Sequence, residues 1–263
     1  MINFFVGLLL SVIISALAVK KGKLTFNAGL TAVAVGASAY GFGGPETGIA
    51  LFAFFASAVL TARFKKRVDF NSAVKARKVS QTLANGLPAA AFALIYYITN
   101  NQIFLFSSIS AIACATADTW SSDIGILSKG ATVSILTLRK IKAGQSGGIS
   151  LLGCVSSILG SVFTGSVYII VSLVRNPEIV SAYPFFLISV CGAAGSFADS
   201  ILGASIQAKY RYQDKIIEEK EKHMINAKLI SGFGFVNNDA VNMLSGFIAG
   251  TICVAASVLM NIY

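Results

Sequence analysis

Apolar residues occur along this chain in long runs that are separated by short polar or basic segments. Most runs are close to the roughly 20 residues that an α-helix needs to cross ~30 Å of hydrocarbon. The runs cover residues 2–19, 24–42, 47–62, 82–99, 103–117, 149–174, 183–208 and 240–262. The pattern therefore predicts an all-α fold, a polytopic bundle of about eight transmembrane helices.

Composition supports the membrane class. Hydrophobic residues make up 55% of the chain and charged residues 12%, and the mean hydropathy is +0.75. An ordinary soluble domain carries about 25% charged residues, so that class is excluded. The first apolar run is expected to be a membrane span and not a cleaved signal peptide, because no basic residue precedes it.

Basic residues fall almost entirely on alternate loops of the predicted bundle. Of the 21 Lys and Arg residues, all except Arg175 lie on one side. The positive-inside bias makes that side the cytoplasmic face and places both termini on the non-cytoplasmic side. A basic face beside anionic lipid headgroups accounts for the net charge of +10, so no nucleic-acid partner is required. The sequence indicates no particular oligomeric state.

Cysteine and histidine are not predicted to do chemistry here. The four cysteines lie singly within predicted spans without C-x-x-C spacing, which is typical of packing residues. His223, the only histidine, lies in a charged segment and is expected at the surface. A histidine-based metal site and a Ser-His triad are therefore excluded.

Five polar clusters lie at the cytoplasmic ends of predicted spans four to eight. Carboxylates and amides are costly in a bilayer, so they mark positions that face a bundle interior or a wet site. The clusters contain Lys78, Gln81 and Asn85; Asp118 and Asp123; Arg139, Lys140, Ser146, Gly147 and Gly148; Asp199; and Asn238 and Asn242. The first three spans carry no such cluster, so we predict an accessory part, residues 1–62, and a site-bearing part, residues 63–263.

Several of these clusters also have a structural explanation. Asp118 and Asp123 lie about 140° apart on a continuous helix, so they converge only if the helix breaks between them. The glycines around Asp199 are typical of close helix packing. Helix capping explains one Asn at the start of span eight but leaves Asn242 unexplained. The glycine loop at residues 144–148 suits either a phosphate cradle or a flexible connection.

The combined inventory suits the binding of Mg²⁺ against the phosphate oxygens of a membrane lipid. Mg²⁺ prefers oxygen ligands and often takes only one or two carboxylates, with water and substrate phosphates as the remaining ligands. Phosphoryl transfer needs mainly positioning and charge neutralisation, so Lys and Arg complete such a site without His or Cys.

Several short motifs resemble those of an integral membrane family that includes phytyl-phosphate kinases of plants and cyanobacteria and uncharacterised archaeal, bacterial and animal proteins. The resemblance covers the chain from Lys78 to Met260. The motifs are Gln81-x-x-Ala84-Asn85-Gly86, Ala117-Asp118-Thr119-Trp120, Gly147-Gly148-Ile149-Ser150, Asp199-Ser200-x-Leu202-Gly203-Ala204 and Asn237-Asn238-x-x-Val241-Asn242. The chain departs from the family at Asp123, where relatives usually have Glu.

The resemblance implies a kinase-like enzyme of the cell membrane, with its active site facing the cytoplasm. It would transfer a phosphoryl group from a nucleoside triphosphate, with CTP favoured, to a prenyl monophosphate such as phytyl phosphate. Two other functions stay open: a CTP-dependent cytidylyltransferase that acts on a lipid phosphate, and a membrane transporter. Transporter sites tend to lie near the midplane between inverted repeats, whereas these clusters favour one face.

Together, the residue chemistry and the resemblance assign roles to the clusters. The predicted metal ligands are Asp118, Asp123 and Asp199. The predicted catalytic residues are Asp118, Asp199, Lys78 and Arg139. The predicted nucleotide and phosphate contacts are Lys140, Ser146, Gly147, Gly148, Asn238, Asn242, Gln81 and Asn85. The prenyl tail, with the surrounding membrane lipids, is expected along the glycine-faced helices of spans seven and eight.

Overall fold

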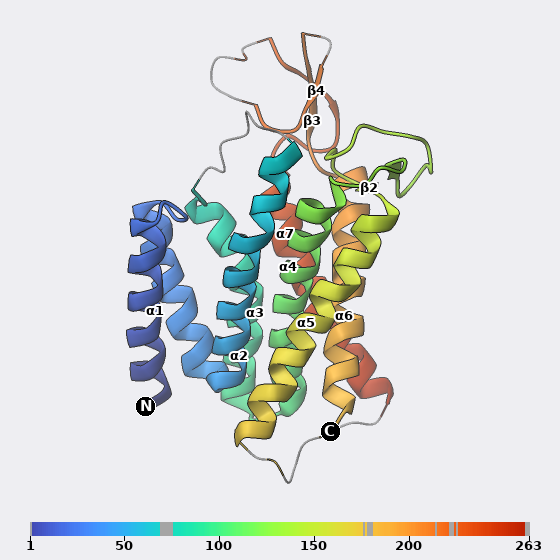
Figure 1. Cartoon of the computed structure of the whole chain (residues 1–263). Coiled ribbons are helices and arrows are strands. Elements are labelled where there is room, and N and C mark those ends of the chain that lie inside the picture. Colours follow the sequence, from blue (N-terminus) through green and yellow to red (C-terminus); the bar gives the residue numbers. More distant parts are fainter. Residues whose placement is uncertain are drawn as a thin grey trace.

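The chain folds into a bundle of upright helices in the computed structural model (Figure 1). The structure describes residues 2–68, 76–175, 177, 181–213, 215–220, 224 and 226–260. His223, which is expected at the surface, lies outside these residues. The described helices are α1 (Ile2–Lys20), α2 (Phe26–Val68), α3 (Val79–Thr99), α4 (Gln102–Gly125), α5 (Leu151–Arg175), α6 (Tyr183–Ser205) and α7 (Asn238–Leu259). These seven are long and apolar enough to span a membrane, which confirms the predicted polytopic α-helical fold.

Helix α2 contains two of the predicted spans. Its backbone leaves the helical conformation at Gly44, where φ is +71°, and Pro45 follows at once. Glycine adopts positive φ without steric cost, and proline is well suited to the first turn of a helix. Phe55 in the second half packs against the cluster that contains Ala28 of the first half, so the chain reverses at Gly44. With α2 counted twice, the described helices cross the bundle eight times.

Both ends of the described chain therefore lie at the same end of the bundle, as Figure 1 shows. Among the described residues, five short strands lie at the other end, where the sequence predicted only loops. These are the antiparallel pair β1 (Val133–Ser134) and β2 (Gly148–Ile149), and a sheet in the order β4 (Lys215–Ile217), β3 (Lys209–Tyr212), β5 (Lys228–Ser231).

Small and hydroxyl-bearing residues let the central helices approach closely. Helix α4 packs against α2, α3, α5, α6 and α7. Ser108 Oγ donates to the Ala89 carbonyl at 2.7 Å, and Ser161 Oγ donates to the Ser189 carbonyl at 2.6 Å. A buried hydroxyl is costly without a partner, and these bonds between helices supply one.

The second half of α2 belongs to this central bundle. Phe54 and Ala58 are buried in the same hydrophobic cluster as Ile109 of α4. Residues 50–58 therefore share a core with the rest of the chain, whereas Ala18, Leu24 and Ala28 form a separate cluster. Helix α1 lies at one edge of the bundle (Figure 1).

Arg175, the single Lys or Arg predicted on the non-cytoplasmic side, forms an ion pair with an acidic residue. Arg175 Nη1 donates to Glu46 Oε1 at 2.6 Å, and Glu46 is buried just beyond the turn in α2. This ion pair joins the end of α5 to the start of the second half of α2, at the end of the bundle opposite the described strands.

The reversal in α2 predicts the side on which each loop is exposed. In a background without the native cysteines, we expect Lys21→Cys and Lys129→Cys to react with a membrane-impermeant maleimide from one side, the cytoplasmic one. Gln102→Cys, at the exposed start of α4, should react from the other side. Labelling of intact and permeabilised cells measures this. If α2 crossed only once, Lys21→Cys and Lys129→Cys would react from opposite sides.

Candidate functional site

A polar cavity of about 760 Å³ lies among the helix ends and loops on the strand-bearing side. Most of the predicted site residues line it: Gln81, Asn85, Asp118, Asp123, Ser146, Gly147, Gly148, Asp199, Asn238 and Asn242. The predicted cations do not line it. Lys78, Arg139 and Lys140 are exposed to solvent outside the lining. The structure thus brings the carboxylates, amides and glycines together, and the roles assigned to them stay predictions.

Asp199 of α6 is buried and held by α7. Its Oδ2 accepts a hydrogen bond from Ser245 Oγ at 2.9 Å. The amide of Asn242, oriented with its nitrogen toward the carboxylate, donates to the same oxygen at 3.1 Å. Asn237 is the helix cap, because its Oδ1 accepts from the Ala240 N–H at 2.9 Å. Capping therefore explains the Asn at position 237. The contact with Asp199 explains the Asn at position 242, one turn inside the helix.

Helix α4 runs without a break through both of its carboxylates. It ends at Gly125, eight positions beyond the predicted end at residue 117, and it has no break between Asp118 and Asp123 that would let the two side chains converge. Asp118 lies close enough to Asp199 for their charges to interact. Asp123 is buried and its Oδ2 accepts a hydrogen bond from Thr61 Oγ1 at 2.9 Å. Both carboxylates of α4 therefore line one cavity, Asp118 toward α6 and Asp123 toward α2.

Trp120 holds the end of α4 against its neighbours. Its indole Nε1 donates to Ser57 Oγ of α2 at 3.1 Å, and its ring stacks on Phe163 of α5 with centroids 5.3 Å apart. A polar stretch that resembles a helix end in the sequence is thus kept helical by tertiary contacts.

The glycine-rich loop lies ahead of α5 and does not form its first turn. Ser150 caps the helix, because its Oγ accepts from the Gly153 N–H at 3.1 Å. Gly147 and Gly148, which were predicted to contact phosphate, therefore precede the helix, and Gly148 belongs to β2. Gly147 has φ of +79°, and a Cβ there would lie 2.4 Å from Cβ of Ala204. Its backbone conformation and its close approach to α6 both require glycine.

Glu218, which sequence analysis missed, binds this loop from the strand region. Its carboxylate accepts hydrogen bonds from the Ser146 N–H at 2.7 Å and from Ser146 Oγ at 2.6 Å. The buried Gln207 also donates to it at 3.2 Å, and Lys209 Nζ donates to the Ser146 carbonyl at 3.0 Å. The donors of Ser146 that were predicted to contact phosphate are thus bonded to a carboxylate in this structure.

Acidic side chains outnumber basic ones in the cavity lining. The acidic ones are Asp118, Asp123, Asp199, Glu218, Glu219 and Asp239, and the basic ones are Lys23 and Arg77. Among the described residues, no three His, Cys, Asp or Glu side chains are grouped closely enough to hold one metal ion. The three predicted metal ligands therefore do not form one centre. Asp118 and Asp199 still fit Mg²⁺, which needs only one or two carboxylates when phosphates supply other ligands.

Arg77 is one of the two basic residues that line the cavity, whereas sequence analysis had chosen the adjacent Lys78. Its backbone pairs with the segment after α1, with the Arg77 N–H donating to the Lys23 carbonyl at 3.0 Å. The guanidinium lies 5.4 Å from the ring centroid of Phe54. Burial lowers the pKa of Arg77, and the nearby Asp123 carboxylate opposes that shift. Arginine is effectively always protonated at neutral pH, so this cation is permanent.

The fold and this cavity define an integral membrane protein with a polar site at one end of its helical bundle. Residues 9–250 match the family described as integral membrane protein DUF92, and the chain belongs to this family. This match confirms the family resemblance that the short motifs indicated.

Three relatives show how far the similarity extends. An uncharacterised membrane protein of Methanocaldococcus jannaschii is 29% identical over 264 residues, which cover 96% of this chain and 93% of that protein. Protein PGR of Arabidopsis thaliana is 29% identical over 157 residues, 57% of this chain and 54% of that protein. Protein VTE6, chloroplastic, of the same plant is 29% identical over 161 residues, 59% of this chain and 39% of that protein. No solved structure matches the chain.

The hydrogen bond to Asp123 predicts a loss of stability when its donor is removed. Thr61→Val keeps the side-chain shape and leaves a buried carboxylate without this hydroxyl. We expect the free energy of unfolding to fall by about 1–3 kcal/mol. Thr31→Val is the matched control, because the Thr31 hydroxyl bonds only its own helix at the Asn27 carbonyl in the described contacts. Thermal unfolding in detergent measures both, and equal effects would contradict the prediction.

The contact between Glu218 and Ser146 predicts how firmly the glycine loop is held. Glu218→Gln weakens two charge-assisted hydrogen bonds, so the Ser146 amide should exchange its hydrogen about tenfold faster. Glu219→Gln, at the exposed neighbouring position, is the control and should leave this rate unchanged. Hydrogen–deuterium exchange of residues 144–148 measures the effect. An unchanged rate in Glu218→Gln would show that the loop is held by other contacts.

Proposed function

We propose that this protein transfers the terminal phosphoryl group of a nucleoside triphosphate, with CTP favoured, to a prenyl monophosphate in the membrane. The product is the prenyl diphosphate, and the reaction depends on Mg²⁺. The observation that carries the proposal is the cavity in which Asp118 and Asp199 lie beside Asn242, at the loop-bearing end of an apolar bundle. The motif resemblance supports the reaction class.

The charge of the cavity supports Mg²⁺ as part of the proposal. Phosphate groups would be repelled by a lining in which carboxylates exceed basic side chains. A bound Mg²⁺ would supply charge neutralisation and phosphate positioning. Asp118 and Asp199 are the residues we assign to hold it, and Ser245 and Asn242 fix the orientation of the Asp199 carboxylate.

The reaction needs little proton transfer from the protein. An oxygen of the lipid phosphate attacks the γ-phosphorus, the bond from that phosphorus to the β,γ-bridging oxygen breaks, and the nucleoside diphosphate leaves. A phosphate monoester has its second pKa at about 6, so the attacking group is already largely ionised at neutral pH. A general base is therefore not required, which agrees with a cavity lining that contains no histidine among the described residues.

The remaining lining residues suit the two phosphate-bearing substrates. We assign the lipid phosphate to Arg77, Gln81 and Asn85, which lie together at the start of α3. The nucleotide is assigned to the loop that contains Arg139, Lys140 and residues 146–148. A nucleotide phosphate that bonds Ser146 would replace the Glu218 carboxylate on the same donors.

Removal of either proposed metal-binding carboxylate should abolish turnover. We expect Asp118→Asn and Asp199→Asn to keep the fold and to lose activity, because an amide cannot replace the charge that holds Mg²⁺. Ser245→Ala should weaken Mg²⁺ activation about ten- to a hundredfold through the orientation of Asp199. Glu46→Gln controls for the loss of an acidic group at the opposite end of the bundle. Retained turnover in both Asn variants would contradict the assignment.

The products decide between this reaction and its alternatives. Purified protein is incubated with Mg²⁺, each nucleoside triphosphate in turn and a panel of prenyl monophosphates, and the products are identified by mass spectrometry. Nucleoside diphosphate with prenyl diphosphate supports the proposal. Pyrophosphate with a nucleotide-linked lipid identifies a cytidylyltransferase, and flux in proteoliposomes without nucleotide consumption identifies a transporter.

A further inference from the structure

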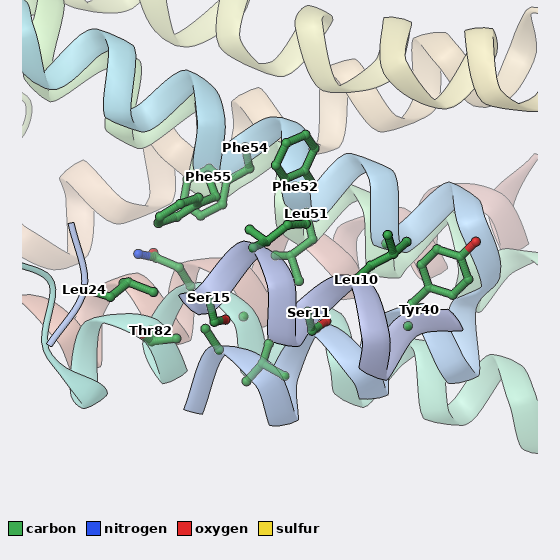
Figure 2. A pocket seen from close by; sticks show the side chains of 18 of the residues that line it. Leu10, Ser11, Ser15, Leu24, Tyr40, Leu51, Phe52, Phe54, Phe55 and Thr82 are labelled. Atoms are coloured by element: carbon green, nitrogen blue, oxygen red, sulfur yellow. The ribbon is translucent and has the colours of Figure 1, made fainter. Parts of the chain in front are cut away.

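An apolar pocket of about 390 Å³ lies among α1, α2 and α3. Its volume falls in the ~300–1,000 Å³ range of small-molecule sites. Figure 2 shows Leu24 and Thr82 at one end and Tyr40 at the other, with Leu51 and Ser11 between them. Along α1 the lining runs from residue 7 to residue 15, a length of about 12 Å at the rise of an α-helix.

This pocket adjoins the polar cavity. Phe55, Arg77, Gln81 and Asn85 line both. The last three are the polar residues to which we assign the lipid phosphate, and they lie where the apolar lining begins. A molecule with a charged head and a long apolar tail matches this change from polar to apolar surroundings.

The tail path expected from the sequence is filled by protein. A Cβ on Gly195 of α6 would lie 2.6 Å from Cβ of Ala249, and a Cβ on Gly250 of α7 would lie 2.1 Å from the Phe92 ring. These glycines allow the helices to pack against one another, as small residues in membrane helices commonly do. The expectation that a prenyl tail lies along these glycine-faced helices is therefore corrected.

We propose that the pocket among α1, α2 and α3 holds the hydrocarbon tail of the lipid whose phosphate lies at Arg77, Gln81 and Asn85. This inference rests on the proposed function for the identity of the head group. Arg77 then marks the boundary, because its guanidinium lies beside Asp123 on the polar side and over the Phe54 ring on the apolar side. Helix α1 and the first half of α2 are the walls of a binding site.

Photolabelling tests where the hydrocarbon tail lies and does not require turnover. The full chain in nanodiscs is irradiated with geranylgeranyl phosphate that carries a diazirine in its last isoprene unit, in the absence of nucleotide. Saturable labelling of α1 and α2, mapped by mass spectrometry, supports the proposal. Labelling of α6 and α7, or competition by phosphatidylcholine as effective as competition by unlabelled geranylgeranyl phosphate, would overturn it.

Two adjacent isoleucines supply a matched pair of variants. Ile14 lines the pocket, whereas Ile13 is exposed on the outside of α1. Ile14→Trp should reduce labelling by geranylgeranyl phosphate about tenfold, equivalent to the loss of one or two buried methylene groups. Ile13→Trp should leave labelling by geranylgeranyl phosphate at the level of the unmodified protein. Equal effects of the two substitutions would count against the pocket.

Tail length separates this inference from the proposed function. If the protein turns over prenyl phosphates, Ile14→Trp should raise KM for geranylgeranyl phosphate and leave KM for isopentenyl phosphate unchanged. An equal rise for both substrates would overturn the tail site, although the kinase reaction would stand. Labelling in the pocket without turnover of any prenyl phosphate would support the tail site and remove the proposed reaction.

Discussion

The burial of carboxylates at one end of an apolar bundle is the constraint on which the rest of this structure depends. An uncompensated buried charge is strongly destabilising, so each carboxylate needs donors that reach it from another helix. Ser245 and Asn242 of α7 supply these donors to Asp199, and Thr61 of α2 supplies one to Asp123. Close packing, such as that of Gly195 against Ala249, holds the helices near enough for such contacts to form. Helix packing and site geometry therefore depend on each other.

The sequence predicted the parts of this arrangement that depend on local spacing. Apolar runs located the spans, and the polar cluster at the start of the last span identified Asn238 and Asn242, which both line the cavity. The continuation of α4 past residue 117 was not predictable, because Thr61 and Trp120 stabilise it through contacts with other helices. Glu218 carries no local signal, since its partner Ser146 lies 72 positions away. Contacts made by strands and loops cannot be predicted from the spacing of residues along the chain.

The structure also separates charges that the sequence grouped on one basic face. Carboxylates dominate the cavity, whereas Lys78, Arg139 and Lys140 are exposed outside its lining. The excess of carboxylates favours cations inside the cavity, and the exposed lysines and arginine favour anions near its rim. The first three spans, expected to be accessory, contribute Thr61 to the site and the walls of the adjacent apolar pocket.

The turn at Gly44 has a consequence for how the chain enters the membrane during synthesis. The two halves of α2 are joined without a polar loop, and Glu46 lies at the tip between them. Its partner Arg175 lies 129 residues further along the chain, so it has not been made when this segment emerges. The carboxylate therefore crosses the bilayer before it can be neutralised by that arginine. Two apolar arms that insert together as one helical hairpin offset this cost.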